Sequence, residues 1–184
     1  MPIKDKANGL DLKVIGALVE KVAADSAEGE TSWKMVTEWT GGARNASRLG
    51  PIRLGSGAID RDVAIEIDEP VELGGTNRSA NPQEHLLAAV NACILTTFVA
   101  QCALRGVALE SVRIETEGDI DLQGFFGLAH GVAPGFEGLS YHIVVKGDGL
   151  ESTFAEIHDV VKATSPNYFV MTNKVALNSR LTVA

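Results

Sequence analysis

The sequence contains little cysteine, little histidine and few aromatic residues, and these shortages exclude several classes of protein. Its two cysteines, Cys93 and Cys102, are too few for the disulfide framework of a small secreted protein. Its four histidines form no pair with the spacing of a zinc motif, so we expect no metal site. The glycine-rich segment 123–138 lacks both the lysine-serine ending of a phosphate loop and the strand-to-helix setting of a dinucleotide fold. We therefore expect no cofactor.

Basic residues are also scarce. Sixteen lysines and arginines stand against 24 acidic residues, which gives a formal charge of −8. Such a surface repels phosphate backbones and anionic lipids, so we expect neither nucleic acid nor a membrane as a partner. The most apolar stretch, residues 86–104, is interrupted by Asn91 and Gln101 and is rich in alanine, which favours a buried helix over a membrane span. The segment Met1–Asp5 lacks the apolar region of a secretory signal, so we expect a cytoplasmic location.

The N-terminal part differs in character from the rest of the chain. Apolar residues recur at helical spacing over residues 10–24 and predict an amphipathic helix. A polar run over residues 24–31 follows this helix. The sequence therefore predicts a helical extension over residues 1–30 and a single domain over residues 31–184, a length suited to one core.

Residues beyond the extension alternate between strand and helix patterns. Apolar and polar residues alternate with a period of two in five segments, which predicts strands over residues 33–39, 63–67, 109–116, 139–145 and 175–183. After the first of these strands we expect a second one over roughly residues 45–52. Consecutive strands with helices between the groups indicate an α+β fold with mainly antiparallel pairing.

Two core helices are predicted between these strands. Asn81, Pro82 and Glu84 have the residue types of an N-cap, a first helical position and a capping box, and this helix should end at Gly106. Its apolar residues surround nearly the whole cylinder, as is typical of a central helix. A second helix covers residues 154–161 and must end at Ser165-Pro166.

Cys93 lies in the middle of the predicted central helix. A free cysteine is most often a small apolar core residue, whereas a reactive thiol needs an electropositive, accessible setting. Cys102 is nine residues further along, so the two thiols lie on opposite faces of the helix and about 13.5 Å apart along its axis. A disulfide within this helix is excluded, and we expect Cys102 to fill the core.

The middle of the chain resembles a known family. The matching residues are Asp68-Glu69-Pro70, Gly74-Gly75, Asn81–Ala89 and Ala92-Cys93, with later counterparts at Arg105-Gly106-Val107, Glu117-Gly118-Asp119, Pro134-Gly135-Phe136 and Ser165-Pro166. This pattern resembles the osmotically inducible protein C / organic hydroperoxide resistance family (OsmC/Ohr) over about residues 33–184. The resemblance implies mainly antiparallel sheets wrapped around two central helices in an intertwined homodimer.

The resemblance also implies a chemistry for Cys93. In the best-studied branch, the cysteine on the central helix reduces organic and inorganic peroxides, with an arginine and a glutamate holding its thiolate. Arg61 is our first candidate for the arginine and Arg44 the second. The peroxidase pattern has its glutamate ten residues before the cysteine, where this chain has Gln83, and Glu84 occupies a position used by a related branch.

Two features of the chain affect this expectation. The second cysteine, which forms a disulfide with the oxidised thiol in the family, is Ser165 here, so an external thiol must restore Cys93. Glu84 and Cys93 lie on opposite faces of one helix, about 13.5 Å apart along it, so a shared site requires the glutamate of a partner chain.

The sequence therefore predicts oxidative-stress defence by a one-cysteine peroxidase that prefers organic hydroperoxides, with Cys93, Glu84 and Arg61 in its site. Whether the chain is an enzyme at all stays open at this stage. One alternative is a non-enzymatic dimer of the same fold that binds a small apolar or thiol-reactive ligand. Another is a redox sensor in which oxidised Cys93 signals to a partner.

Overall fold

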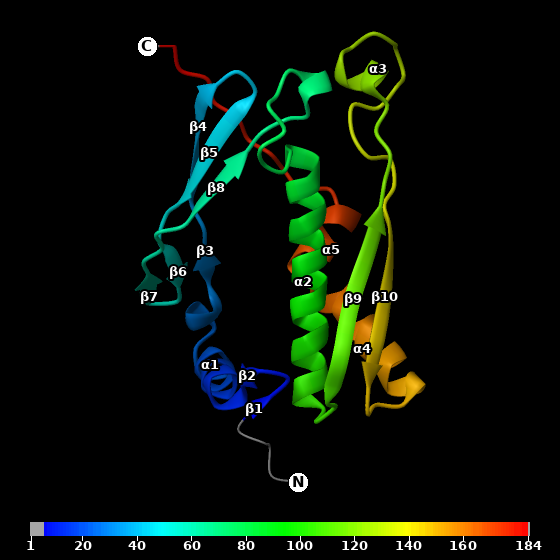
Figure 1. Cartoon of the computed structure of the whole chain (residues 1–184). Helices are drawn as coiled ribbons and strands as arrows, with labels where there is room; N and C mark the ends of the chain where they lie inside the picture. Colours follow the sequence, from blue (N-terminus) through cyan, green and yellow to red (C-terminus); the bar gives the residue numbers. More distant parts are fainter. Residues whose placement is uncertain (1–5, 184) are drawn as a thin grey trace. The chain divides into compact units, whose positions relative to one another are not determined.

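The computed structural model describes residues 6–183, so the segment Met1–Asp5, on which the expectation about a signal sequence depends, lies outside the described residues. The chain divides into two compact units. One unit comprises the chain up to Leu10 together with the chain from Ala89 onward, and the other comprises Asp11–Ala88. Each unit is described by itself below, and the elements are labelled in Figure 1. The predicted division at residue 30 stays a prediction.

The Asp11–Ala88 unit begins with the predicted amphipathic helix, which is confirmed as α1 (Leu12–Ala24). The carboxylate of Asp11 caps this helix by accepting hydrogen bonds from the backbone N–H groups of Lys13 and Val14. A short 3₁₀ turn, η1 (Ser26–Gly29), follows it.

Two three-stranded antiparallel sheets complete this unit. One has the order β4 (Met35–Gly41), β5 (Arg44–Leu49), β8 (Ala64–Ile67), and the other β3 (Thr31–Ser32), β6 (Ile52–Leu54), β7 (Gly57–Ile59). The strand predicted over residues 45–52 is therefore wrong as one element. It is divided at Gly50-Pro51 between two sheets, because proline has no N–H to donate to a ladder.

The loop between β8 and the central helix is organised by Asp68. Its buried carboxylate accepts hydrogen bonds from the Thr76 hydroxyl and from the backbone N–H groups of Glu69, Thr76 and Arg78. These bonds, that of the Thr76 hydroxyl foremost, hold the pKa of Asp68 far below its ordinary value despite burial. The loop includes the 3₁₀ turn η2 (Val71–Leu73) and passes so close to itself that a Cβ on Gly75 would collide with the Glu69 carbonyl oxygen.

The central helix, α2 (Pro82–Leu104), begins and ends where the sequence predicts. Asn81 and Glu84 form the predicted capping box, since each side chain accepts the other residue's backbone N–H at 2.8–2.9 Å. Beyond its C-terminal end Gly106 has a φ of +72°, the left-handed conformation that glycine adopts most readily.

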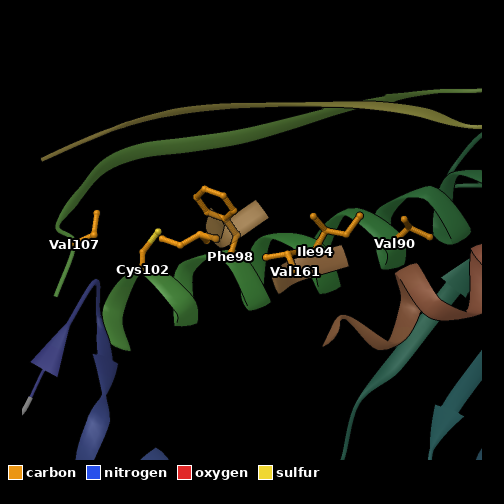
Figure 2. Packing of buried hydrophobic residues seen from close by; sticks show 7 residues of the cluster. Val90, Ile94, Phe98, Cys102, Val107 and Val161 are labelled. Carbon is orange, nitrogen blue, oxygen red and sulfur yellow. The ribbon is translucent and has the colours of Figure 1, made fainter. Parts of the chain in front are cut away.

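In the other unit, α2 lies along an antiparallel hairpin of β9 (Leu109–Glu117) and β10 (Ser140–Gly147), with α4 (Glu151–Thr164) also packed against it (Figure 1). Figure 2 shows the core that these elements share. Its buried residues are Val90, Ile94, Phe98, Cys102, Val107, Ile157 and Val161. By length and composition alone α2 could cross a membrane, a test that core helices of soluble proteins also pass, and five of its residues are buried in this chain.

A short hairpin, β1 (Lys6–Ala7) and β2 (Leu10–Asp11), joins this unit near the start of β9. The Asn8 side chain in its turn donates to the Val107 carbonyl oxygen at 2.9 Å and accepts the Leu109 N–H at 3.0 Å. The sequence pattern does not predict this hairpin, because strands of two residues are too short to show a period of two.

The predicted last strand is wrong. Residues 173–183 form no helix or strand, and their apolar side chains project into solvent, with Leu177 at 95% exposure and Leu181 at 88%. The alternation over residues 175–183 is typical of a strand, but no neighbouring strand in the described part of the chain pairs with it. Two short helices were also not predicted, namely α3 (Leu122–Phe125) and α5 (Pro166–Thr172).

Candidate functional site

The candidate site is centred on Cys93, in the middle of α2. This residue is partly exposed, whereas the neighbouring residue Ile94 is fully buried. The hydroxyl of Ser165 donates a hydrogen bond to the Cys93 sulfur, with an Oγ–Sγ distance of 3.3 Å. These residues are 72 positions apart, and the packing of α4 against α2 brings them together.

Ser165 is the residue at which α4 ends and α5 begins. It is 1% exposed, its N–H donates to the Val161 carbonyl at 2.9 Å, and its carbonyl accepts the Phe169 N–H at 3.0 Å. Two residues later, the Asn167 side chain donates to the Ala89 carbonyl of α2 at 2.9 Å. The junction between α4 and α5 is therefore tied to α2 one turn before Cys93.

The second thiol lies in a different environment. Cys102 is fully buried in the core, and burial raises the pKa of its thiol to about 11, although Arg105 opposes the shift. Both cysteines are free, as the helix geometry predicts. The expectation that Cys102 fills the core is confirmed, and Cys93 is the more exposed of the two cysteines.

Glu84 and Gln83, the two candidates for the carboxylate position, lie in the first turn of α2 and within the Asp11–Ala88 unit. Glu84 is exposed, and its carboxylate accepts the Asn81 N–H in the capping box. Capping gives Glu84 a structural role in its own chain. Its predicted role beside the thiol stays a prediction.

The two candidate arginines also belong to the Asp11–Ala88 unit. Arg44 is the first residue of β5, and Arg61 lies in the segment before β8 that has no regular secondary structure. Both are exposed. Both arginines therefore belong to the unit that does not contain Cys93. A contact between either arginine and Cys93 stays a prediction.

Ser165 is the site residue that sequence reasoning did not find. The sequence shows a serine where the resembled family has its second cysteine, which indicates only that the disulfide-forming thiol is lost. The contact with the sulfur could not be inferred, because it depends on how two helices pack. Across the described residues 6–183, no three histidine, cysteine or acidic side chains gather as a metal ion would require.

A small pocket lies on another face of α2, within the same unit as Cys93. It has a volume of about 230 Å³ and lies between α2, the β9–β10 hairpin and α5. Its lining is mainly apolar and includes Val90, Ile94, Phe136, Leu139, Tyr168 and Met171. Tyr141, which also lines it, has its hydroxyl 2.7 Å from Nε2 of His158, and burial raises the pKa of this tyrosine. A pocket of this size suits a small apolar molecule.

Comparison with known proteins gives one family match. The family model described as OsmC-like protein matches residues 75–180, which include α2, Cys93 and Ser165. None of the curated proteins matches the sequence.

Solved structures provide an independent comparison of the fold. An OsmC-like protein from Mycoplasma pneumoniae superposes with a TM-score of 0.56 and 15% identity, over 78% of this chain and 87% of that one. A Psychrobacter arcticus protein, described as an osmotic stress induced and detoxification response protein, superposes with a TM-score of 0.56 and 14% identity. The match covers 77% of this chain and 88% of that one. An OsmC-like protein of unknown function from Vibrio cholerae superposes with a TM-score of 0.54 and 12% identity, over 76% of this chain and 92% of that one. At these identities the likeness shows a shared α+β fold with antiparallel sheets.

Proposed function

The chain belongs to the OsmC-like protein family, and from this membership we propose that it reduces hydroperoxides through Cys93 as the single reacting thiol. The observation that carries the proposal is the contrast between its two cysteines. Cys93 is partly exposed with a hydroxyl donor at its sulfur, whereas Cys102 is buried and its pKa is raised. Reactive cysteines occupy accessible polar surroundings, and inert ones are buried among apolar side chains.

The proposed reaction begins with the Cys93 thiolate. Its sulfur attacks one oxygen of the peroxide, the O–O bond breaks, and the other oxygen leaves and takes up a proton as an alcohol, or as water when the substrate is hydrogen peroxide. The sulfur loses two electrons and becomes sulfenic acid, while the peroxide gains them. The substrate class is an organic hydroperoxide.

An external thiol completes the cycle. Its sulfur displaces hydroxide from the sulfenic acid, which releases water and forms a mixed disulfide on Cys93. A second external thiol then attacks the mixed disulfide, restores Cys93 and leaves as a symmetric disulfide. The external reductant is required because the side chain that contacts the sulfur, Ser165, carries an oxygen, which cannot form a disulfide.

The rest of the proposed site comes from a homodimer in which Arg61 and Glu84 act beside Cys93. Glu84 is nine residues from Cys93 on one unbroken helix, so the same chain cannot supply both groups to one site. The exposed apolar tail over residues 173–183 supports an assembly, because it has the pattern of a strand without a partner strand. Glu69 also supports an assembly. Buried polar atoms ordinarily have a hydrogen-bond partner, yet the buried Oε2 of Glu69 has no donor among the described residues.

The decisive experiment is stopped-flow oxidation of the full-length protein by cumene hydroperoxide and by hydrogen peroxide, with the sulfenic acid trapped and located by mass spectrometry. We expect fast, saturable oxidation of Cys93 with the organic peroxide preferred. Cys93→Ser abolishes it, and Cys102→Ala, which removes only the buried thiol, preserves it. A wild-type rate no greater than that of a free small-molecule thiol would refute the peroxidase. Stoichiometric oxidation without turnover in excess external thiol would identify a sensor instead.

The pocket of about 230 Å³ supports a second candidate, a ligand-binding member of the family without turnover. Val90, Ile94 and Met171 would contact the apolar part of the ligand. Isothermal titration with a small aromatic alcohol should then show binding that is lost in Ile94→Trp, which fills the pocket. Binding that Ile94→Trp leaves unchanged would exclude this pocket as the binding site.

A further inference from the structure

The Ser165 hydroxyl does not make the bond that its place in the chain predicts. A serine at a helix N-cap ordinarily accepts a hydrogen bond from the second or third backbone N–H of the helix. Ser165 is the N-cap of α5, yet its side chain makes no such bond. Its hydroxyl hydrogen is directed to the Cys93 sulfur instead.

The surroundings fix Ser165 in this arrangement. The residue is 1% exposed, and its backbone N–H and carbonyl are occupied by Val161 and Phe169. The nearby bond from Asn167 to the Ala89 carbonyl ties the start of α5 to α2 independently of Ser165. The hydroxyl is therefore held where the sulfur of Cys93 is its acceptor.

Within its own unit of the chain, Cys93 has few other means of stabilising a negative charge. It lies in the middle of α2, away from the positive end of the helix dipole. Within the described residues, the Ser165 hydroxyl is the one hydrogen-bond donor to the sulfur. A hydrogen bond to the charged form of a group favours that form, because charge on the acceptor strengthens the bond.

We infer that Ser165 is a positioning residue for Cys93, whose hydroxyl favours the thiolate and fixes the direction of its sulfur. This inference rests on the proposed function, since it concerns the thiol assigned to peroxide reduction. A hydroxyl also leaves the oxidised sulfur without an internal disulfide partner. The same residue thus promotes the first step and leaves the later steps to the external thiol.

The test measures the alkylation of Cys93 by iodoacetamide, located by peptide mass spectrometry, across a pH range of about 5 to 10. Alkylation reports thiolate and needs no peroxide. We expect Ser165→Ala to move the midpoint of the Cys93 profile upward by about one pH unit, so that alkylation below the midpoint is about tenfold slower. Ser165→Thr, which keeps the hydroxyl, should retain the wild-type profile. Thermal unfolding of each variant checks that it is folded.

A third variant measures proximity without relying on the hydroxyl. In Ser165→Cys, one equivalent of peroxide should convert Cys93 to sulfenic acid. The new thiol should then condense with the sulfenic acid, which releases water and forms an internal disulfide. This product has an intact mass lower by two hydrogens.

An alkylation profile in folded Ser165→Ala identical to that of the wild type would overturn the inference, even if the wild type reduces peroxides. A shifted profile in a protein that reduces no peroxide would uphold the role of Ser165 and refute the peroxidase.

Discussion

Single residues decide how two thiols on one helix differ. Cys93 and Cys102 share α2, yet Cys93 contacts a hydroxyl in a partly exposed position and Cys102 contacts buried apolar side chains. The difference arises from which neighbouring element each residue faces, because nine residues bring a side chain to the opposite face of a helix. Helical geometry therefore separates a candidate reactive thiol from a structural one.

Asp68 gives a prediction about pH. The Thr76 hydroxyl and the backbone N–H groups around the carboxylate lower its pKa in the folded chain, so protonation is harder there than in the unfolded chain. Its contribution to the free energy of unfolding is therefore complete above the ordinary value near 3.8 and is lost as pH falls through the lower, folded value. Asp68→Asn should be clearly less stable than the wild type at pH 7.

The measurement is denaturant unfolding of wild type and Asp68→Asn at neutral pH and at successively lower pH. The difference between their free energies of unfolding should shrink in acid, because the asparagine does not titrate. Asp119→Asn, which removes an exposed acidic side chain that makes no hydrogen bond or ion pair within residues 6–183, serves as the matched control for the lost charge. A stability gap that is constant with pH would contradict the role assigned to the Asp68 charge.

The limits of sequence reasoning at this scale are clear at two residues. The capping role of Glu84 follows from its three-residue spacing to Asn81, and it is observed. The contact of Ser165 with Cys93 joins positions 72 apart, and no local pattern records it. Local hydrogen bonds can be predicted from spacing, whereas contacts between helices depend on packing.

At the scale of elements, α2 should contribute more to stability than any surface helix. Phe98 is 2% exposed and stacks on Phe154 of α4 with ring centroids 6.3 Å apart. Phe98→Ala should lower the free energy of unfolding by about 3–5 kcal/mol, the range for a phenylalanine deleted from a core. Leu104→Ala, on the same helix at 53% exposure, should cost no more than about 0.5 kcal/mol. Chemical denaturation compares the two, and equal losses would contradict the described core.

The sequence predicts an element of the fold where its pattern spans many residues, and the prediction fails where the pattern is short. The periodicity of α1, α2, β9 and β10 spans enough residues to identify each element. The strands β1 and β7 have two and three residues, too few for a pattern to appear. The prediction of a strand over residues 175–183 fails for a different reason, because a strand also needs a neighbouring strand for its hydrogen bonds.

At the scale of the whole molecule, the tail gives a test of the proposed homodimer. Leu177 is 95% exposed, and in an extended chain it projects to the side opposite Asn178. If a second copy covers the apolar side, Leu177→Lys places an ammonium group in that interface and should convert the dimer to monomers. Asn178→Lys adds the same charge on the other side and should leave the dimer intact. Light scattering after size exclusion distinguishes them, and a wild-type monomer would refute the homodimer.

The unpaired tail also bears on how the protein reaches its folded state. The strands β9 and β10 pair within one chain, so their ladder can form at a rate independent of concentration. A tail whose partner strand belongs to another molecule finds it only by collision. Its ordering would then be a bimolecular step, and freshly synthesised chains would pass through a dilution-sensitive stage with Leu177 and Leu181 uncovered.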